Sequence, residues 1–219
     1  MKKVYVAIIG CGTVGGGTLD ILTENREVIM RKSGAEFEVK KILDKYPEKL
    51  AGKVSADKLA SSLDEILADP EISVVVETMG GVEPAKTFIL KCFAAGKNVV
   101  SANKELIAKQ WGELEAAAKE NGVGFYFEAS CVGGVPVIRT LTESLQGDNI
   151  TSIAGIFNGT TNFILSKMTD EGSDYAEVLK EAQKLGFAEA NPTADVEGYD
   201  AAYKLSVLSS LAFGEYVPY

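Results

Sequence analysis

Residues 4–15, with the sequence VYVAIIGCGTVG, decide the fold of this chain. A short apolar run rich in β-branched residues leads directly into a G-x-G-x-x-G pattern, formed by Gly10, Gly12 and Gly15. The first glycine permits a tight turn, the second lets the backbone approach a pyrophosphate, and the third lets helix and strand pack closely. A helix beginning at Thr13 would then point its N-terminal N–H groups at the phosphates. The stretch predicts a dinucleotide-binding unit of strand, loop and helix; a tight turn without a ligand is the alternative.

The alternation of strand and helix continues downstream. Further strands are expected in short apolar runs, at residues 37–43, 73–77, 98–101 and 123–128. Helices are expected where apolar residues recur at helical spacing, at residues 13–30, 63–68, 84–95, 103–109 and 112–121. The polar stretch 44–62 predicts a loop with short helical pieces. This alternation predicts an α/β fold with a doubly wound, Rossmann-type parallel sheet, whose ligands bind at the carboxyl ends of the strands.

The pattern changes near residue 134. Helices are predicted at residues 134–145, 161–168, 174–185 and 198–213, and a strand at 150–157. We therefore expect a first domain over residues 1–134 and part of an α+β domain over residues 135–219.

Composition excludes several classes of protein. The chain has 219 residues, of which 46% are apolar, and its net charge of −9 argues against a nucleic-acid partner. No apolar run approaches the roughly 18–20 residues that a membrane span needs, so no membrane partner is expected. The three cysteines, Cys11, Cys92 and Cys131, have no metal-binding or disulfide spacing, which favours the cytoplasm. The chain has no histidine, so catalysis that depends on histidine is excluded and proton transfer must use another group.

Polar residues at two predicted strand ends are candidates for contacts with the nucleotide. Asp44 follows the second strand, where an acid would accept a hydrogen bond from a free 2′-hydroxyl and favour NAD. Lys45 is adjacent and could instead face a 2′-phosphate, so NAD and NADP both remain open. Ser101 to Lys104 lead from a strand into a helix, and Lys104 could reach the nicotinamide ribose or the substrate, although a surface lysine is the commoner case.

The second half contains an acidic segment, residues 186–204, that ends in a lysine. Asp200 and Lys204 are four residues apart and share a helix face, which alone would be a surface salt bridge. Apolar neighbours predict that this helix is mostly buried, and an irregular acidic loop before it favours a binding role. The polar cluster at residues 158–162, Asn-Gly-Thr-Thr-Asn, precedes a helix, which Thr160 or Thr161 could cap.

Taken together, the ordered motifs of the chain resemble the homoserine dehydrogenase family. The resemblance extends over essentially the whole chain, and its most specific parts are Asn-Gly-Thr-Thr-Asn-Phe and Asp-x-Glu-Gly-x-Asp-x-x-x-Lys. The stretches that carry it are residues 10–15, 77–81, 99–104, 127–136, 158–165, 186–204 and 212–214. Such enzymes interconvert L-homoserine and L-aspartate 4-semialdehyde with NAD or NADP, in threonine and methionine biosynthesis. The resemblance also implies a homodimer or larger assembly, and a second domain that binds substrate and dimerises.

The resemblance implies roles for particular residues. Lys204 would be the general acid and base; Asp200 and Glu189 would hold the substrate, with the Gly186 backbone nearby; and Lys104 would lie at the nicotinamide end. The expected cofactor contacts are Gly10, Gly12, Thr13, Val14, Gly15, Thr78, Ser101 and Lys104. A structural sodium ion would be held by the carbonyl oxygens of Glu128, Cys131, Gly133 and Val135. Cys131 replaces another small or apolar residue of the motif, a change that backbone ligation tolerates.

The chemistry of alcohol oxidation is consistent with these residues. A hydride must leave carbon and a proton must leave the hydroxyl, and without histidine a lysine is a credible proton acceptor. Carboxylates also suit a substrate that carries an ammonium group. Two alternatives remain: another nicotinamide oxidoreductase of small amino or hydroxy acids, and a truncated, non-catalytic nucleotide-binding module. The second is considered because members of the family usually continue well beyond the Ala-Phe-Gly motif at residues 212–214.

Overall fold

The computed structural model describes residues 2–219, which divide into two compact units. The first unit ends at Ser130 and the second begins at Cys131, four residues before the expected boundary. In the described residues no helix is both long and apolar enough to cross a bilayer.

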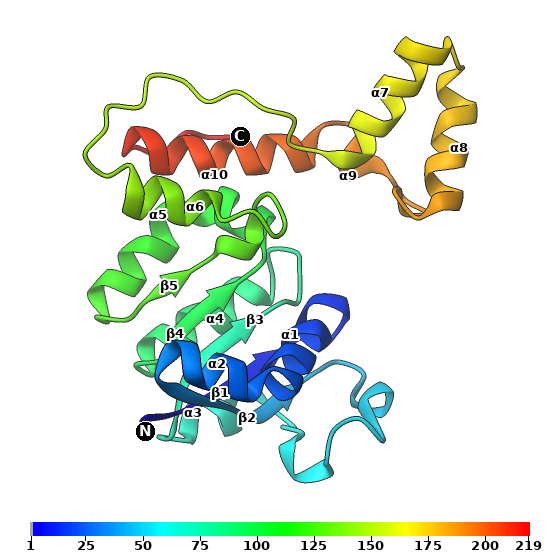
Figure 1. Cartoon of the computed structure of the whole chain (residues 1–219). Helices are drawn as coiled ribbons and strands as arrows, with labels where there is room; N and C mark the ends of the chain where they lie inside the picture. The colour runs from blue at the N-terminus through cyan, green and yellow to red at the C-terminus, as the bar shows by residue number, and fades with distance from the viewer. Residues whose placement is uncertain (1) are drawn as a thin grey trace. The chain divides into compact units, whose positions relative to one another are not determined.

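The first unit contains a five-stranded sheet (Figure 1). Its strands are β1 (Lys2–Ile9), β2 (Ala35–Leu43), β3 (Ile72–Glu77), β4 (Asn98–Ser101) and β5 (Phe125–Tyr126). They pair in parallel in the order β2-β1-β3-β4-β5, which confirms the predicted Rossmann-type sheet. The chain reverses its direction of winding between β1 and β3, so their carboxyl ends form the switch point at which such sheets bind ligands.

Helices of the first unit follow the predicted order, with two corrections. They are α1 (Thr13–Glu24), α2 (Arg26–Ser33), α3 (Leu63–Ala68), α4 (Ala85–Ala94) and α5 (Lys104–Glu120). The helix expected over residues 13–30 is two helices, because the backbone leaves the helical region at Asn25 (φ −99°, ψ 18°). The two helices expected over residues 103–121 are one, α5, with a kink at Gln110. The predicted loop 44–62 holds the short helices η1 (Pro47–Leu50) and η2 (Ala56–Lys58).

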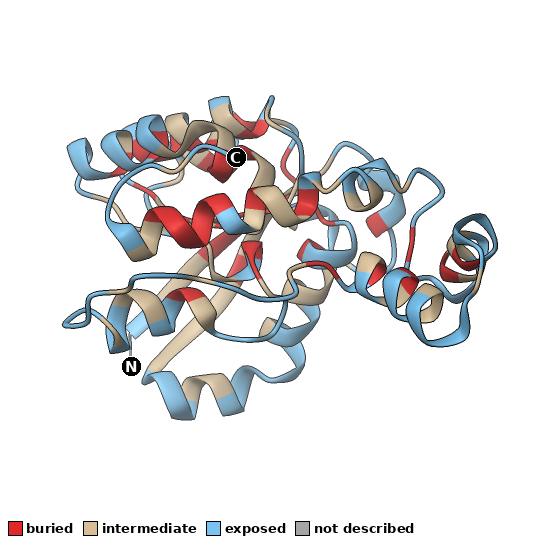
Figure 2. Cartoon of the chain, turned by 90° about the horizontal axis from the view of Figure 1, so that it is seen from above, coloured by how far each residue is buried: buried red, intermediate tan, exposed pale blue. Residues whose placement is uncertain are grey.

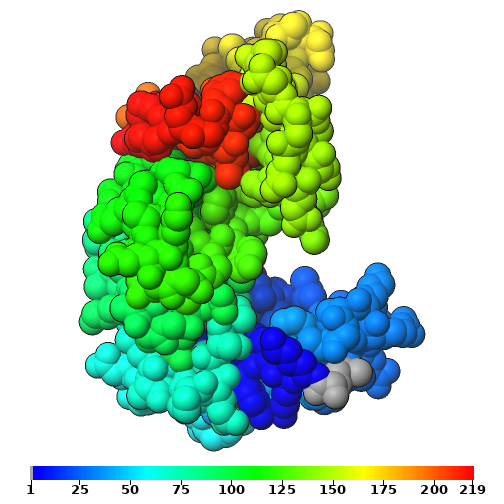
Figure 3. Space-filling model, turned by 90° about the vertical axis from the view of Figure 1, so that its left-hand side faces the viewer, coloured from blue at the N-terminus to red at the C-terminus, as the bar shows by residue number. Residues whose placement is uncertain are grey.

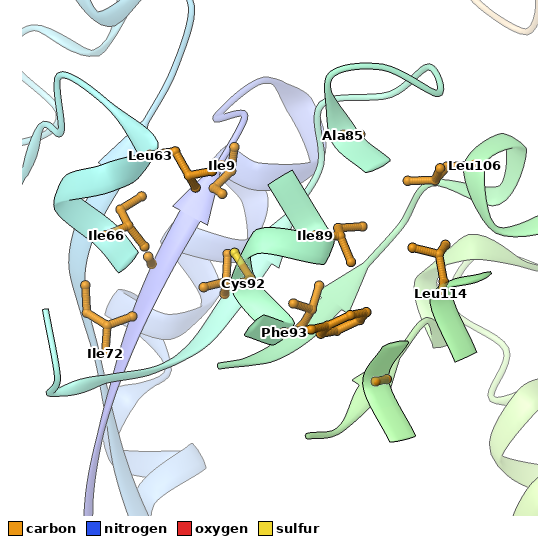
Figure 4. Packing of buried hydrophobic residues seen from close by; sticks show 14 of the residues in the cluster. Ile9, Leu63, Ile66, Ile72, Ala85, Ile89, Cys92, Phe93, Leu106 and Leu114 are labelled. Carbon is orange, nitrogen blue, oxygen red and sulfur yellow. The ribbon is translucent and has the colours of Figure 1, made fainter. Parts of the chain in front are cut away.

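Two hydrophobic clusters cover the two faces of this sheet. Figure 2 shows in red the buried segments of the chain. Because side chains alternate along a strand, β1 sends Ala7 and Ile9 into one cluster and Val6 and Ile8 into the other. Residues of α3, α4 and α5 complete the first cluster, in which Leu63 of α3 lies beside Ile9 and in which Ile89 and Phe93 of α4 lie close together (Figure 4). Leu19 and Leu22 of α1 pack against the second. Helices on both faces hold β1 rigidly beneath the glycine loop.

The second unit is helical in its described residues. Its elements are α6 (Val137–Arg139), the π-helical turn η4 (Thr140–Ser144), α7 (Gly159–Glu171), α8 (Tyr175–Leu185), α9 (Thr193–Val196) and α10 (Tyr199–Phe213). Helices α7 and α8 form a hairpin with its own small core, built on Ile164, Val178 and Ala182. Helix α10 buries Tyr203, Val207 and Leu208, as its sequence pattern predicts.

One predicted strand is absent. Residues 150–157 lie outside any helix or strand and run along the surface (Figure 3). Their β-branched composition favours an extended chain, but a strand exists only when another strand pairs with it. The described part of the second unit supplies no such strand, so this expectation is wrong for the structure.

Candidate active site

The glycine loop joins β1 to α1 and is pressed against the end of β3. Gly10 has a left-handed backbone (φ +84°) and its N–H donates to the carbonyl of Leu43 at 2.8 Å. A Cβ atom at Gly15 would lie 2.0 Å from the Gly10 oxygen, so this position accepts glycine alone. At Gly12 nothing lies within 4 Å of the corresponding point, which leaves the approach to the backbone open. These are the three roles that the motif predicts.

The first turn of α1 follows the loop directly. Thr13 and Val14 open the helix, and no acidic side chain lies in its first turn. The first N–H groups of any helix lack partners within that helix and carry the positive end of its dipole. This turn can therefore receive phosphate oxygens without a repelling carboxylate.

Asp44 lies at the end of β2, beside the glycine loop. Its Oδ2 accepts a hydrogen bond from the Cys11 N–H at 2.6 Å, and its Oδ1 accepts one from the Tyr46 N–H at 2.7 Å. The two bonds hold a carboxylate at the edge of the loop, where a ribose reader is expected. Each oxygen keeps a further lone pair, so the group can still accept from a ligand.

The other strand ends carry a buried polar network. Ser101 donates to Glu77 Oε2 at 2.6 Å, and Glu77 Oε1 accepts from the Met79 N–H at 2.8 Å. Thr78 donates through its hydroxyl to the Gly10 carbonyl. Thr78 and Ser101 thus have protein partners and shape the loops around the switch point. Glu77, only 1% exposed, was not among the predicted site residues, since its importance depends on pairing across strands.

Lys104 begins α5 and is half-buried. The helix is capped by Asn103, whose Oδ1 accepts from the Leu106 N–H at 3.1 Å and whose amide donates to the Gly81 carbonyl at 2.6 Å. This cap fixes the start of α5 against the loop that follows β3, and so fixes the backbone from which Lys104 extends.

Lys204 and Asp200 form an ion pair on α10, in which Asp200 is buried and Lys204 is half-buried. Lys204 Nζ donates to Asp200 Oδ2 at 2.5 Å and to the Phe157 carbonyl at 2.9 Å. The side chains are 17% and 7% exposed, which excludes the alternative of a surface salt bridge. Burying this pair costs solvation energy, so the arrangement is weak evidence for a stabilising role.

Asn158 and Asp195 extend this pair into a network. The Asn158 amide donates to Asp200 Oδ2 at 2.9 Å and to Asp195 Oδ1 at 2.7 Å. Sequence spacing could not reveal these contacts, which join residues 42 and 37 positions apart. The prediction that Thr160 or Thr161 caps α7 is also corrected, because the cap is Asn158 itself.

The remaining predicted substrate residues lie on the loop after α8. Gly186 ends α8 with a left-handed backbone (φ +81°), and Glu189 is exposed, with its carbonyl accepting from Gln183 at 3.1 Å. Both positions open to solvent.

Three of the four predicted sodium ligands, Cys131, Gly133 and Val135, lie in or next to a tight turn. Val132 and Gly133 both have left-handed backbones (φ +55° and +58°), and the Val135 N–H donates to the Val132 carbonyl at 3.1 Å. Glu128 lies in the short helix η3 (Glu128–Ser130) of the first unit. Within residues 2–219 no three acidic or cysteine side chains converge as metal ligands.

The fold and the glycine loop define a dinucleotide-binding α/β protein, and its second unit contains a half-buried lysine paired with a buried aspartate. Two family models match the chain: "Homoserine dehydrogenase, NAD binding domain" over residues 10–128 and "Homoserine dehydrogenase" over residues 136–219. The chain belongs to the homoserine dehydrogenase family.

Individual relatives agree with this assignment. A homoserine dehydrogenase of Bacillus subtilis is 48% identical over 214 residues, which are 97% of this chain and 49% of the relative. The crystal structure of a homoserine dehydrogenase from Thiobacillus denitrificans matches 98% of this chain and 50% of its own, with a TM-score of 0.92 and 48% identity. A hyperthermophilic archaeal homoserine dehydrogenase in complex with NADPH matches 98% of this chain and 71% of its own, with a TM-score of 0.81 and 32% identity. The chain spans about half the length of the curated relatives it matches.

Proposed function

We propose that this chain carries the nucleotide-binding and proton-transfer parts of an enzyme that interconverts L-homoserine and L-aspartate 4-semialdehyde. The observation that carries the proposal is the buried Lys204–Asp200 pair, in a chain that also contains the dinucleotide loop. Another nicotinamide oxidoreductase would share the loop, but it would not account for this pair together with the family match. The reaction belongs to threonine and methionine biosynthesis, which assigns the protein to the cytoplasm.

The proton chemistry assigned to Lys204 follows from its hydrogen bonds. A protonated lysine has three N–H donors, and two are directed at Asp200 and the Phe157 carbonyl. The third direction remains for the oxygen of a substrate. In reduction, Lys204 donates a proton to the nascent alkoxide; in oxidation, the neutral amine accepts the hydroxyl proton. A bound nicotinamide dinucleotide would supply or accept the hydride.

The substrate's ammonium group calls for acceptors. We assign Asp200 and Glu189 to this role, with the Gly186 backbone beside them, because carboxylates bind ammonium by charge-assisted hydrogen bonds. The exposed position of Glu189 leaves its carboxylate available to a ligand.

NAD or NADP would be held by Gly10, Gly12, Thr13, Val14 and Gly15, with Thr78, Ser101 and Lys104 along the other strand ends. Of the two cofactors we propose that NAD is preferred. The fixed Asp44 carboxylate can accept from a 2′-hydroxyl, whereas a 2′-phosphate would meet its negative charge. Lys45 on the same loop is exposed, so water weakens any attraction between its charge and a 2′-phosphate.

Replacing Asp44 tests this preference. In Asp44→Ser the repulsion of a 2′-phosphate is gone, so the affinity ratio of NAD to NADP should fall by about tenfold or more, roughly the effect of one charge-assisted contact. Titration calorimetry with each nucleotide measures the ratio, and Asp64→Ser, an exposed acid on α3, is the control. An unchanged ratio would refute the assignment of Asp44.

We also propose that the protein binds a structural sodium ion and forms an oligomer. A sodium ion would be held by the carbonyl oxygens of Glu128, Cys131, Gly133 and Val135, as the family resemblance implies; oxygen atoms are the ligands that such hard cations prefer. The chain is also proposed to act as a homodimer or larger assembly, in line with its family.

The test of the proposed activity is a homoserine-dependent rise in the absorbance of reduced nicotinamide. Wild-type protein should reduce NAD only when L-homoserine is present. Lys204→Ala should remove most turnover, by about 100-fold or more, and leave nucleotide affinity unchanged. Lys184→Ala, an exposed lysine at the end of α8, should keep wild-type turnover. A substrate panel separates the alternatives: activity on another small amino or hydroxy acid favours the related oxidoreductase, and binding without turnover favours a non-catalytic module.

A further inference from the structure

The side chain of Asn158 joins three elements of the second unit through its two ends. Its Oδ1 accepts from the Thr161 N–H at 2.8 Å and from the Thr161 hydroxyl at 3.0 Å, and so caps α7. Its Nδ2 donates to Asp195 on α9 at 2.7 Å and to Asp200 on α10 at 2.9 Å. Only this orientation of the amide satisfies the contacts, because ionised carboxylates accept and cannot donate. The residue is 6% exposed, so water does not readily replace these bonds.

The hydrogen bonds of Asn158 Oδ1, which cap α7, do not explain why this residue is asparagine. Serine and aspartate cap helices about as well. The hydrogen bonds of the Nδ2 group do explain the choice of asparagine. The carboxylates of Asp195 and Asp200 converge on this group, and they would repel each other if no donor lay between them. Among the side chains that favour the capping position, asparagine alone adds an amino group with two N–H donors.

Asp200 Oδ2 is the atom that links this amide to the ion pair. The same oxygen accepts from Asn158 and from Lys204, so the amide restrains the carboxylate oxygen that the lysine contacts. The carboxylates of Asp195 on α9 and Asp200 on α10 both contact the Asn158 amide, and Lys204 contacts Asp200. Without the amide, Asp195 would repel Asp200 and shift the acceptor against which Lys204 is aligned.

We propose that Asn158 is a positioning residue for the Lys204–Asp200 pair. It acts through Asp200, holding the carboxylate at the orientation that directs Lys204 Nζ. The catalytic meaning of this role rests on the proposed function, whereas the arrangement itself can be tested without turnover.

The first experiment measures the pH dependence of stability in Asn158→Asp. Aspartate keeps the cap of α7 but replaces the bridging donor by a third carboxylate. At about pH 8, where carboxylates are ionised, the variant should unfold at clearly lower denaturant concentration than the wild type. At about pH 5 the difference should shrink, because one of the three carboxyl groups can hold a proton and donate to a neighbour.

Controls separate this effect from capping. Asp174 caps α8 and is exposed, with its Oδ1 accepting from the N–H groups of Ala176 and Glu177. The swap Asp174→Asn should leave stability nearly unchanged at both pH values. In Asn158→Asp with Asp195→Asn, an amide donor returns to the cluster and one carboxylate is removed, so stability at about pH 8 should partly recover.

The second experiment is kinetic and uses Asn158→Ser, which retains a capping hydroxyl and adds no charge. The value of kcat for homoserine oxidation should fall by about tenfold or more, as expected for a misplaced catalytic group, with nucleotide affinity unchanged. Asn158→Ser also tests the positioning role of Asn158 if Asn158→Asp does not fold.

The outcomes are distinct. Wild-type stability of Asn158→Asp at both pH values would overturn the proposal, and so would a wild-type kcat in Asn158→Ser. If the wild-type chain does not oxidise homoserine, the proposed function fails, and the pH-dependent stability of Asn158→Asp alone decides whether Asn158 holds the acids.

Discussion

The glycines of α1 and its preceding loop differ in what surrounds them, although they lie within eight residues of one another. A Cβ atom at Gly15 would meet the Gly10 oxygen at 2.0 Å and Thr78 Oγ1 at 2.6 Å, so backbone must move. At Gly12 and at Gly17 a Cβ would meet nothing within 4 Å. The protein interior therefore restricts Gly15, whereas Gly12 is free of protein contacts on the side where a pyrophosphate is expected.

Alanine at each of the three positions gives different predictions. Gly15→Ala should lose both stability, by about 1–3 kcal/mol as expected for overpacking, and nucleotide affinity. Gly12→Ala should remain folded and lose affinity by about tenfold or more, because its methyl group occupies the space of the phosphates. Gly17→Ala should keep its affinity and gain about 0.5–1 kcal/mol, since alanine favours a helix. Denaturant unfolding and calorimetric titration measure the two quantities; equal affinity in Gly12→Ala and wild type would contradict the role of the loop.

At the scale of single residues, local spacing predicted part of the site. The i,i+4 relation of Asp200 and Lys204 and the apolar neighbours of their helix predicted a buried pair, which the structure contains. Asn158, Asp195 and Glu77 were not predicted as site residues, because their partners lie far away in the sequence. A local sequence pattern does not reveal hydrogen bonds between residues that are far apart in the sequence.

At the scale of elements, a buried lysine connects α3, β3 and the turn after α4. Lys97 is 3% exposed, and its Nζ donates to the carbonyls of Asp69 at 2.7 Å and Ile72 at 2.8 Å. Burial lowers the pKa of Lys97, and the nearby Asp69 only partly opposes this. Lys97 therefore joins the end of α3 to the start of β3. It lies at the amino-terminal edge of the sheet, whereas the glycine loop lies at the carboxyl-terminal edge.

Removing this connection should destabilise the first unit without affecting nucleotide contacts. Lys97→Met leaves two carbonyl oxygens without their donors, at a cost of about 2 kcal/mol or more. Because folded Lys97 releases its proton at lower pH than the unfolded chain does, the stability of wild type relative to this variant should rise with pH just below 10.5. Lys91→Met, an exposed lysine on α4, should change stability by less than about 0.5 kcal/mol. If Lys97→Met is as stable as the wild type, the two hydrogen bonds contribute nothing to stability.

The order of elements was predictable in the first unit and less so in the second. Strand β1 is buried on both faces between helices, so its continuous apolar run identifies it. Residues 150–157 have an equally β-rich sequence, but strand formation depends on a partner that local composition does not contain. The break at Asn25 and the merging of α5 involve one or two residues each, where sequence patterns are least informative.

At the scale of the whole molecule, the first unit contains its own sheet, both of its hydrophobic clusters and all the proposed nucleotide contacts. A unit with its own core can fold alone. Residues 1–130 should therefore unfold cooperatively and bind NAD within about threefold of the affinity of the full chain. Circular dichroism and calorimetry measure these properties; an isolated first unit that is folded but does not bind nucleotide would contradict the assignment of the glycine loop.

The proposed function requires hydride transfer between an amino-acid alcohol and a nicotinamide ring. The most direct measurement uses L-homoserine in which deuterium replaces both hydrogens of the hydroxyl-bearing carbon. It is incubated with wild-type protein and NAD, and the dinucleotide is then analysed by mass spectrometry. We expect reduced NAD that carries the deuterium, and none with Lys204→Ala over the same time. Reduced NAD without deuterium, or no reduced NAD from the wild-type protein, would contradict the account.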